Sequence, residues 1–392
     1  MKKYAISFLL IFVGILFISA QEKVDTFEFK TVKANPITSI KDQASSSTCW
    51  SFSGLAFLES EILRTSNKEV DLSPMYVVYK SYLDKADKYV RMHSETNFGP
   101  GGSFYDVLYC WKNYGIVPTT EMTGLNYGTP RHNHKELDNI LQSYIDNIAK
   151  AKGTISTVWK KPFEAILQAY LGVPPTDFIV DGKKFTPTEY AKSFGLNTDD
   201  YVSLTSFTHH PFYQKFTLEI PDNWRWSESY NLPIDELMQV FDYAINNGYT
   251  VAWGSDVSER GFTRTGTAVL PETDITNLSG SDQAKWTGVS QTEIENQIYK
   301  VNGPRPERNV TQEMRQKEFD NFQTTDDHGM LIFGIAKDQN GTKYYMVKNS
   351  WGITGKYKGI WYVSEAFVKL KTMNIVVNKN SIPKELKQKL GI

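Results

Sequence analysis

The secondary structure that the sequence predicts changes in kind about two thirds of the way along the chain. From residue 50 to about residue 248, most segments show the apolar spacing and end signals of helices. Four later runs of β-branched and aromatic residues, bounded by glycine and turn residues, are typical of strands: 249–253, 328–336, 344–348 and 359–363. Because helices and strands are segregated, we expect an α+β fold in which a helical part packs against an antiparallel sheet.

The composition is that of a globular protein whose fold does not depend on disulfides. The 392 residues include 43 Lys and Arg against 44 Asp and Glu, a formal net charge of −1, and two cysteines. A near-neutral chain has no strong field to attract nucleic acid, so we expect no nucleic acid partner.

The first twenty residues have the pattern of a secretory signal peptide. Lys2 and Lys3 precede an uncharged apolar run of 14 residues, and Ala20 is a small residue suited to cleavage. Such a run is shorter than the roughly 20 residues that span a bilayer, which favours cleavage over an uncleaved anchor. We therefore expect a signal peptide at 1–20, a mature chain at 21–392 without a stable membrane span, and a periplasmic or extracellular location.

Cys49 is predicted to lie at the N-terminus of a helix that is apolar on most faces. The segment before it is small and polar, and residues 50–64 contain no proline. The unpaired N–H groups and the dipole of a helix N-terminus favour the thiolate, the nucleophilic form of cysteine. The alternative is a disulfide with Cys110, but that residue falls among apolar residues of another predicted helix, where a buried free thiol is expected.

His328 and Asn349 are predicted to lie on the same face of two neighbouring antiparallel strands. A turn signal at 338–341 separates the strands, and loops of two or four residues there both keep the two side chains on one face. We prefer the four-residue loop, which pairs Asn349 with Met330 and leaves it about 7–8 Å from His328. The Asn349 amide would then fix the imidazole tautomer, with Trp351 shielding that bond from water.

Three blocks of residues resemble, in order, those of the papain-like cysteine peptidases. They are Gln43 with Cys49-Trp50-Ser51-Phe52, Asp327-His328-Gly329, and Asn349-Ser350-Trp351-Gly352. The chain is more specifically similar to the bleomycin hydrolase and bacterial aminopeptidase C branch, on Asp71-Leu72-Ser73, Gly101-Gly102 and Tyr114-Gly115-Ile116-Val117-Pro118. Cys49 and His328 lie 279 residues apart, against about 130–150 in the papain type, so roughly 130 residues are inserted.

The resemblance implies a two-lobed papain-like fold with a helical lobe, an antiparallel β-barrel-like lobe and a helical insertion. The expected ranges are about 40–118 for the helical lobe, 119–248 for the insertion, 249–375 for the β-rich lobe and 376–392 for a C-terminal tail. In that branch a C-terminal arm brings its carboxylate to the substrate amine, and this sequence ends at Ile392, where a further extended stretch is expected. The branch is also generally cytosolic, so the signal peptide is a second departure.

The resemblance also implies a role for each candidate site residue. Cys49 would be the nucleophile, His328 the base and Asn349 the residue that orients the base. Gln43 and the Cys49 N–H would donate to the oxyanion. Residues expected to contact the substrate are Gly101, Gly102 and Trp351.

The expected substrates are peptides, and the preferred prediction is an aminopeptidase. An endopeptidase with an open cleft and an inert peptide-binding protein are the alternatives. A homo-oligomer, a hexamer in that branch, is implied as well. We expect no cofactor and no metal, because no cysteine or carboxylate stands at a recognised spacing beside the paired histidines, for which surface or capping roles are predicted: His132, His134, His209 and His210.

Overall fold

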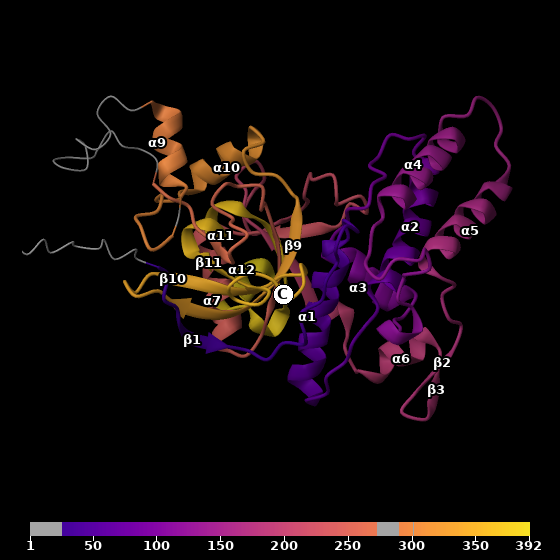
Figure 1. Ribbon diagram of the computed structural model, residues 1–392, viewed down its shortest axis with the longest axis horizontal. Coiled ribbons are helices and arrows are strands. Elements are labelled where there is room, and N and C mark those ends of the chain that lie inside the picture. The colour runs from indigo at the N-terminus through magenta and orange to yellow at the C-terminus, as the bar shows by residue number, and fades with distance from the viewer. Residues whose placement is uncertain (1–25, 273–289, 301) are drawn as a thin grey trace, which may run out of the picture.

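A helical part and a β-rich part lie side by side, with helix α1 (Cys49–Ser66) between them (Figure 1). The computed structural model describes residues 26–272, 290–300 and 302–392. The predicted signal peptide at 1–20 lies outside the described residues. The α+β prediction is confirmed.

The helical part is built on long amphipathic or fully buried helices. The bounds of its other helices are α2 (Pro74–Arg91), α3 (Phe104–Asn113), α4 (Lys135–Ala149), α5 (Lys160–Leu171) and α6 (Pro187–Ser193). Helix α2 begins after Ser73, which is its N-cap and accepts a hydrogen bond from the Tyr76 N–H. The apolar faces of these helices form one continuous core with α1, which fixes the position of the Cys49 end of α1.

The β-rich part contains one ten-stranded sheet with the order β5-β6-β4-β12-β7-β9-β10-β11-β8, and β1 pairs with β9 off this path. The strands are β1 (Lys30–Ala34), β4 (Tyr201–Thr205), β5 (Lys215–Thr217), β6 (Glu228–Asn231), β7 (Val251–Ser255), β8 (Thr267–Ala268), β9 (His328–Lys337), β10 (Lys343–Lys348), β11 (Ile360–Ser364) and β12 (Thr372–Asn378). The helices of this part are α7 (Ile234–Asn246), α9 (Gln291–Ile298), α10 (Gln312–Asp320), α11 (Glu365–Lys371) and α12 (Lys384–Leu390). The terminal strands β5 and β8 do not pair with each other, so the sheet is open and the barrel-like closure expected for this lobe is wrong.

The segment 119–248, expected to be mostly helical, also contains strands. A hairpin of β2 (Phe178–Val180) and β3 (Lys183–Phe185) lies within it, and β4 and β6 join the main sheet. Strand β12 runs between β4 and β7, so the segment predicted as a tail from residue 376 begins inside a central strand. These short strands form because the sheet pairs with them, and their local sequence alone is a weak signal.

The two parts meet where α1 packs on β9. A side chain at Gly329 would not fit there, because an added Cβ would lie 2.7 Å from the Ser53 Oγ. Ser53 in turn donates to the Cys49 carbonyl at 2.7 Å. This close approach brings the first turn of α1 against the first residues of β9.

Candidate active site

Cys49 occupies the first position of α1, beside the start of β9. The backbone of Gly329 hydrogen-bonds its thiol, which places the sulfur one residue from His328. The next residue, Trp50, is anchored by a hydrogen bond of 2.9 Å from its Nε1 to the Pro100 carbonyl. Cys49 is partly exposed, whereas Cys110 is buried, and both thiols are free.

His328 and Asn349 form a direct hydrogen bond of 2.8 Å between Nε2 and Oδ1. The same Oδ1 accepts from the Ser350 N–H at 2.7 Å, which identifies that atom as the amide oxygen. Because this oxygen can only accept, the His328 Nε2 must carry a proton. The Nδ1 of the neutral ring is therefore the nitrogen with a lone pair, able to take a proton from a thiol.

The hairpin that joins these two residues has neither of the predicted loops. Its loop covers residues 338–342. Next to this loop Met346 pairs with Gly334, and if this register continued along both strands, Asn349 would lie on the face opposite His328. A register shift follows, so that Val347 pairs with Ile332. This bulge restores the register in which both side chains share a face.

Trp351 lies over the imidazole, as the sequence predicts. Its ring centroid is 4.9 Å from that of His328, and it packs edge-on against Trp361 at 5.4 Å and Phe262 at 5.9 Å. The indole covers one side of the His328–Asn349 hydrogen bond, and exclusion of water strengthens such a bond.

The Gln43 amide is held by Ser350, a residue to which the sequence analysis assigned no role. The Gln43 N–H donates to the Ser350 carbonyl at 2.8 Å, and the Ser350 hydroxyl donates to the Gln43 Oε1 at 2.5 Å. No described residue accepts a hydrogen bond from the Gln43 Nε2, so this nitrogen is left to donate to a substrate oxygen. A cavity of about 450 Å³ opens on this side, lined by Asp42, Ala44, Ser45, Thr129, Arg131, His132, Asn133 and Trp351.

Gly101 and Gly102 lie between Asp222 and Trp50, the residue that follows Cys49. A Cβ added at Gly102 would lie 2.8 Å from the Trp50 ring, and one at Gly101 would lie 2.2 Å from both carboxylate oxygens of Asp222. The backbone of Gly102 also hydrogen-bonds the Asp222 carboxylate. Asp222 was missed by sequence reasoning, since it belongs to the insertion and carries no motif.

The electrostatics of the site oppose the thiolate that the helix N-terminus was predicted to favour. Burial raises the pKa of Cys49 to about 12, and the negative fields of Asp222 and Asp326 add to this effect. Burial also lowers the pKa of His328 to about 4, although the bond to Asn349 acts in the opposite direction. Burial thus acts on both groups in the direction of their neutral forms, against the effect of the helix N-terminus on the thiol.

The predicted surface or capping role is wrong for the His134 side chain. His134 directly precedes α4 and is fully buried. Neither of its ring nitrogens has a hydrogen-bond partner among the described residues. Burial lowers its pKa to about 4, with a smaller contribution from His132. His132 is partly buried and packs edge-on against Phe52, with the ring centroids 6.0 Å apart.

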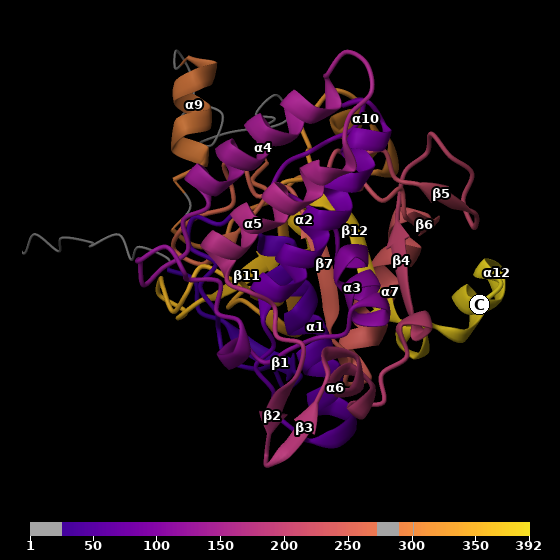
Figure 2. The same ribbon diagram turned by 90° about the vertical axis from the view of Figure 1, so that its right-hand side faces the viewer.

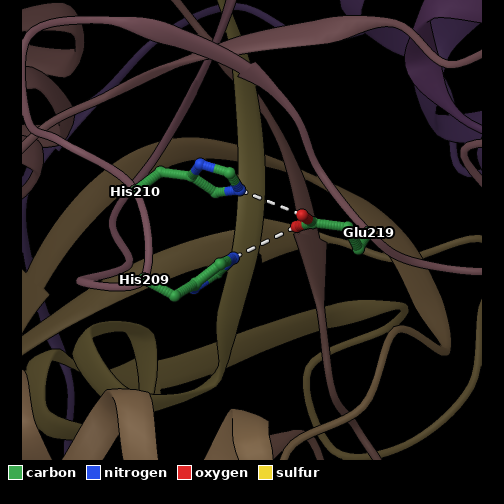
Figure 3. Close-up of side chains that lie close together, drawn as sticks. All are labelled: His209, His210 and Glu219. Atoms are coloured by element: carbon green, nitrogen blue, oxygen red, sulfur yellow. Dashed lines mark hydrogen bonds and ion pairs between the residues drawn. The ribbon is translucent and has the colours of Figure 1, made fainter.

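His209 and His210 both point toward one carboxylate, that of Glu219 (Figure 3). Their Nε2 atoms lie 3.1 and 2.9 Å from its two oxygens, and the three side chains could face one metal ion. However, the Gln316 Nε2 approaches the His209 Nδ1 at 3.0 Å, while its Oε1 accepts from the Thr208 N–H. That amide orientation leaves the proton of His209 on Nε2, as a donor to Glu219, so the geometry favours hydrogen bonding over metal binding.

Among the described residues, no helix is both long and apolar enough to cross a membrane. This finding does not extend to residues 1–25, which include the predicted signal peptide.

Comparison with known proteins agrees with the site geometry. The Peptidase C1-like family model matches residues 86–391, a range that begins after Cys49. Cysteine proteinase 1, mitochondrial, from Saccharomyces cerevisiae is 23% identical over 94% of this chain and 80% of its own length. Aminopeptidase G from Lactobacillus delbrueckii subsp. lactis is 22% identical over 91% of this chain and 84% of its own length.

A solved structure shows the same fold. The crystal structure of PepW from Lactobacillus rhamnosis superposes with a TM-score of 0.70 and 20% sequence identity, covering 92% of this chain and 84% of that chain. The chain therefore belongs to the Peptidase C1-like family and is a papain-like cysteine peptidase, similar to bleomycin hydrolase and to bacterial aminopeptidase C.

Proposed function

We propose that this protein is an exported cysteine aminopeptidase that removes residues from the free amino end of peptides. The observation that carries the catalytic part is the His328–Asn349 hydrogen bond, which orients the imidazole beside the Cys49 thiol. The aminopeptidase part is supported by the names of relatives that align with about nine tenths of this chain, Aminopeptidase G and Aminopeptidase C.

In the proposed reaction the Cys49 thiol gives its proton to the His328 Nδ1 as the sulfur attacks the scissile carbonyl carbon. The Gln43 Nε2 and the Cys49 N–H donate to the oxyanion that forms. The imidazolium then protonates the leaving amine, the C–N bond breaks, and an acyl-enzyme remains. Water, deprotonated by His328, attacks this thioester, and the released sulfur regains the proton.

Exopeptidase action is tested with one peptide in two forms, with a free amine and with an acetylated amine. A clear preference for the free-amine form is expected, with no turnover of either by Cys49→Ala. Equal rates on both forms would show an endopeptidase with an open cleft. Full activity of Cys49→Ala would overturn both catalytic versions and leave a peptide-binding protein.

Export and assembly form part of the same proposal. The signal-peptide pattern at 1–20 supports export, and intact-mass analysis of the secreted protein should give an N-terminus at Gln21. A protein retained in the cell at full length would contradict it. The oligomeric state, a hexamer by resemblance, is measured on the same sample by light scattering after gel filtration.

A further inference from the structure

The carboxylate of Asp222 lies beside Gly101 and Gly102, the two glycines expected to contact the substrate. It touches the position that a Gly101 side chain would occupy and is hydrogen-bonded by the Gly102 backbone. Its charge acts directly on the Cys49 thiol. An extended substrate whose scissile carbonyl sits at Cys49 and whose backbone follows Gly101 and Gly102 would therefore run into this carboxylate.

Asp222 is held in place by the segment around it. The Asn223 amide nitrogen donates to the carbonyls of Leu218 and Ser227, both at 2.9 Å, which closes this part of the chain into a tight loop. Trp224 Nε1 then ties the loop to α3 through a hydrogen bond of 3.1 Å to Asp106. The carboxylate is thus preorganised, and a ligand that binds it need not order the loop.

The cations near Asp222 are engaged by other groups. The buried Lys85 ammonium donates to the carbonyls of Gly99 and Gly101, and Arg225 pairs with Asp84 at 2.7 Å and with Asp106 at 2.5 Å. No described lysine or arginine nitrogen lies within 4.0 Å of the Asp222 carboxylate. Among the described residues, the hydrogen bonds to this carboxylate come from the Gly102 backbone and, at a long distance of 3.5 Å, from the Asn97 amide, so lone pairs remain for a further donor.

We propose that Asp222 binds the free α-ammonium group of the peptide substrate and thereby makes this enzyme an exopeptidase. This inference rests on the proposed aminopeptidase function. The proposal places the ammonium one or two residues before the scissile bond, because Asp222 lies beside Gly101 and an extended chain advances only about 3.3–3.6 Å per residue. A longer or acylated substrate would place neutral, bulkier atoms against the half-buried Asp222 carboxylate. The carboxylate would then disfavour binding of such substrates as well as favour binding of a free ammonium group.

The described C-terminal residues do not offer a carboxylate at this position. Helix α12 lies at the edge of the β-rich part, away from α1 (Figure 2). Lys389 of α12 pairs with Glu236 of α7 at 2.5 Å, and Ile392 packs on the core around α7. An aspartate inside the chain would thus perform the recognition that the resemblance assigns to a C-terminal arm.

The experiment measures kcat/KM for a free-amine peptide and its acetylated twin with the wild type, Asp222→Asn and Asp222→Glu. Glu219→Gln is the matched control, because Glu219 lies on the same segment and pairs with His209 and His210 outside the cleft. We expect Asp222→Asn to lower kcat/KM for the free-amine peptide by 10-fold or more (order of magnitude for a lost ammonium–carboxylate contact), mainly through KM. Turnover of the acetylated peptide should not fall, Asp222→Glu should recover part of the loss, and Glu219→Gln should behave as the wild type.

The outcomes separate this inference from the function on which it rests. A wild type that does not discriminate between the peptides overturns the aminopeptidase proposal itself. A selective wild type with an equally selective Asp222→Asn overturns the role of Asp222 alone. If Asp222→Asn raises kcat/KM equally for both peptides, the carboxylate merely obstructs substrate binding. If it lowers kcat/KM equally for both, the role of Asp222 is structural. Asp222→Ser, checked by near-ultraviolet circular dichroism, replaces Asp222→Asn if the latter does not fold.

Discussion

The side-chain oxygen of Asn349 accepts a hydrogen bond from the His328 Nε2, with 2.8 Å between the nitrogen and the oxygen. Since the same oxygen is fixed by the Ser350 N–H, the amide cannot rotate without breaking two hydrogen bonds. The imidazole is thereby fixed in the tautomer and orientation that a general base for Cys49 requires.

Asn349→Ala should lower kcat/KM about 10- to 100-fold, the equivalent of losing roughly 1.5–3 kcal/mol from one strong hydrogen bond. Steady-state kinetics measure the loss, and far-ultraviolet circular dichroism should show an unchanged fold. Asn340→Ala is the control, because Asn340 is exposed in the loop of the same hairpin. Wild-type rates in Asn349→Ala would contradict the orienting role.

Ser350→Ala should lower kcat about 10-fold, because without the hydroxyl the Gln43 amide loses the bond that aims its Nε2 (about 1 kcal/mol or slightly more). Gln43→Ala should cost more, on the order of 10²–10³ in kcat, as for other oxyanion donors. The double variant should be no slower than Gln43→Ala. Additive losses would mean that Ser350 acts independently of Gln43.

Asp222→Asn should make Cys49 react faster with iodoacetamide near pH 8. The charges that act on the thiol are those of Asp222 and Asp326, which both raise its pKa. Removing one anion lowers this pKa, so a larger fraction is thiolate at any pH below it. The pH–rate profile of alkylation should shift toward lower pH in Asp222→Asn and stay in place in Glu219→Gln. Identical profiles for all three proteins would show that the field of Asp222 does not reach the sulfur.

His134→Leu should make the protein less sensitive to acid. Burial lowers the pKa of His134 to about 4. Below about pH 6.5 the imidazole is therefore protonated in the unfolded chain but stays neutral in the folded state. Its contribution to stability is complete above pH 6.5 and is lost as the pH falls toward 4. Denaturant unfolding should show that the wild type loses about 2 kcal/mol more than the variant between pH 7 and pH 5. If the free energy of unfolding falls equally in the wild type and in His134→Leu, His134 can be protonated in the folded state.

The sequence predicted those parts of the structure that depend on local signals. The start of α1 at Cys49 follows from the small polar residues placed before a largely apolar run. The shared face of His328 and Asn349 was predicted too, but for an incomplete reason: the pairing next to the loop is off by one residue, and the bulge between Met346 and Val347 corrects it. Strand alternation cannot reveal a bulge, because all residues of β9 except Lys337 are buried.

The remaining features depend on contacts between distant segments. β4 and β12 are strands because they pair with each other, and whether the sheet closes is decided at β5 and β8, far apart in the chain. Asp222 reaches the cleft through the fold of the insertion, which no short motif encodes. The effect of burial and of an aspartate 173 residues away on the thiol pKa could not be predicted either, because both depend on the folded chain.

The central place of β12 in the sheet has a consequence for biosynthesis. During translation Cys49 is synthesised long before β9. Strand β12, near the end of the chain, must insert between β4 and β7 before the sheet is complete. A nascent chain therefore carries the nucleophile without its base and without a finished scaffold. Proteolytic capacity should therefore appear only at the close of synthesis, when β12 has paired with both neighbours.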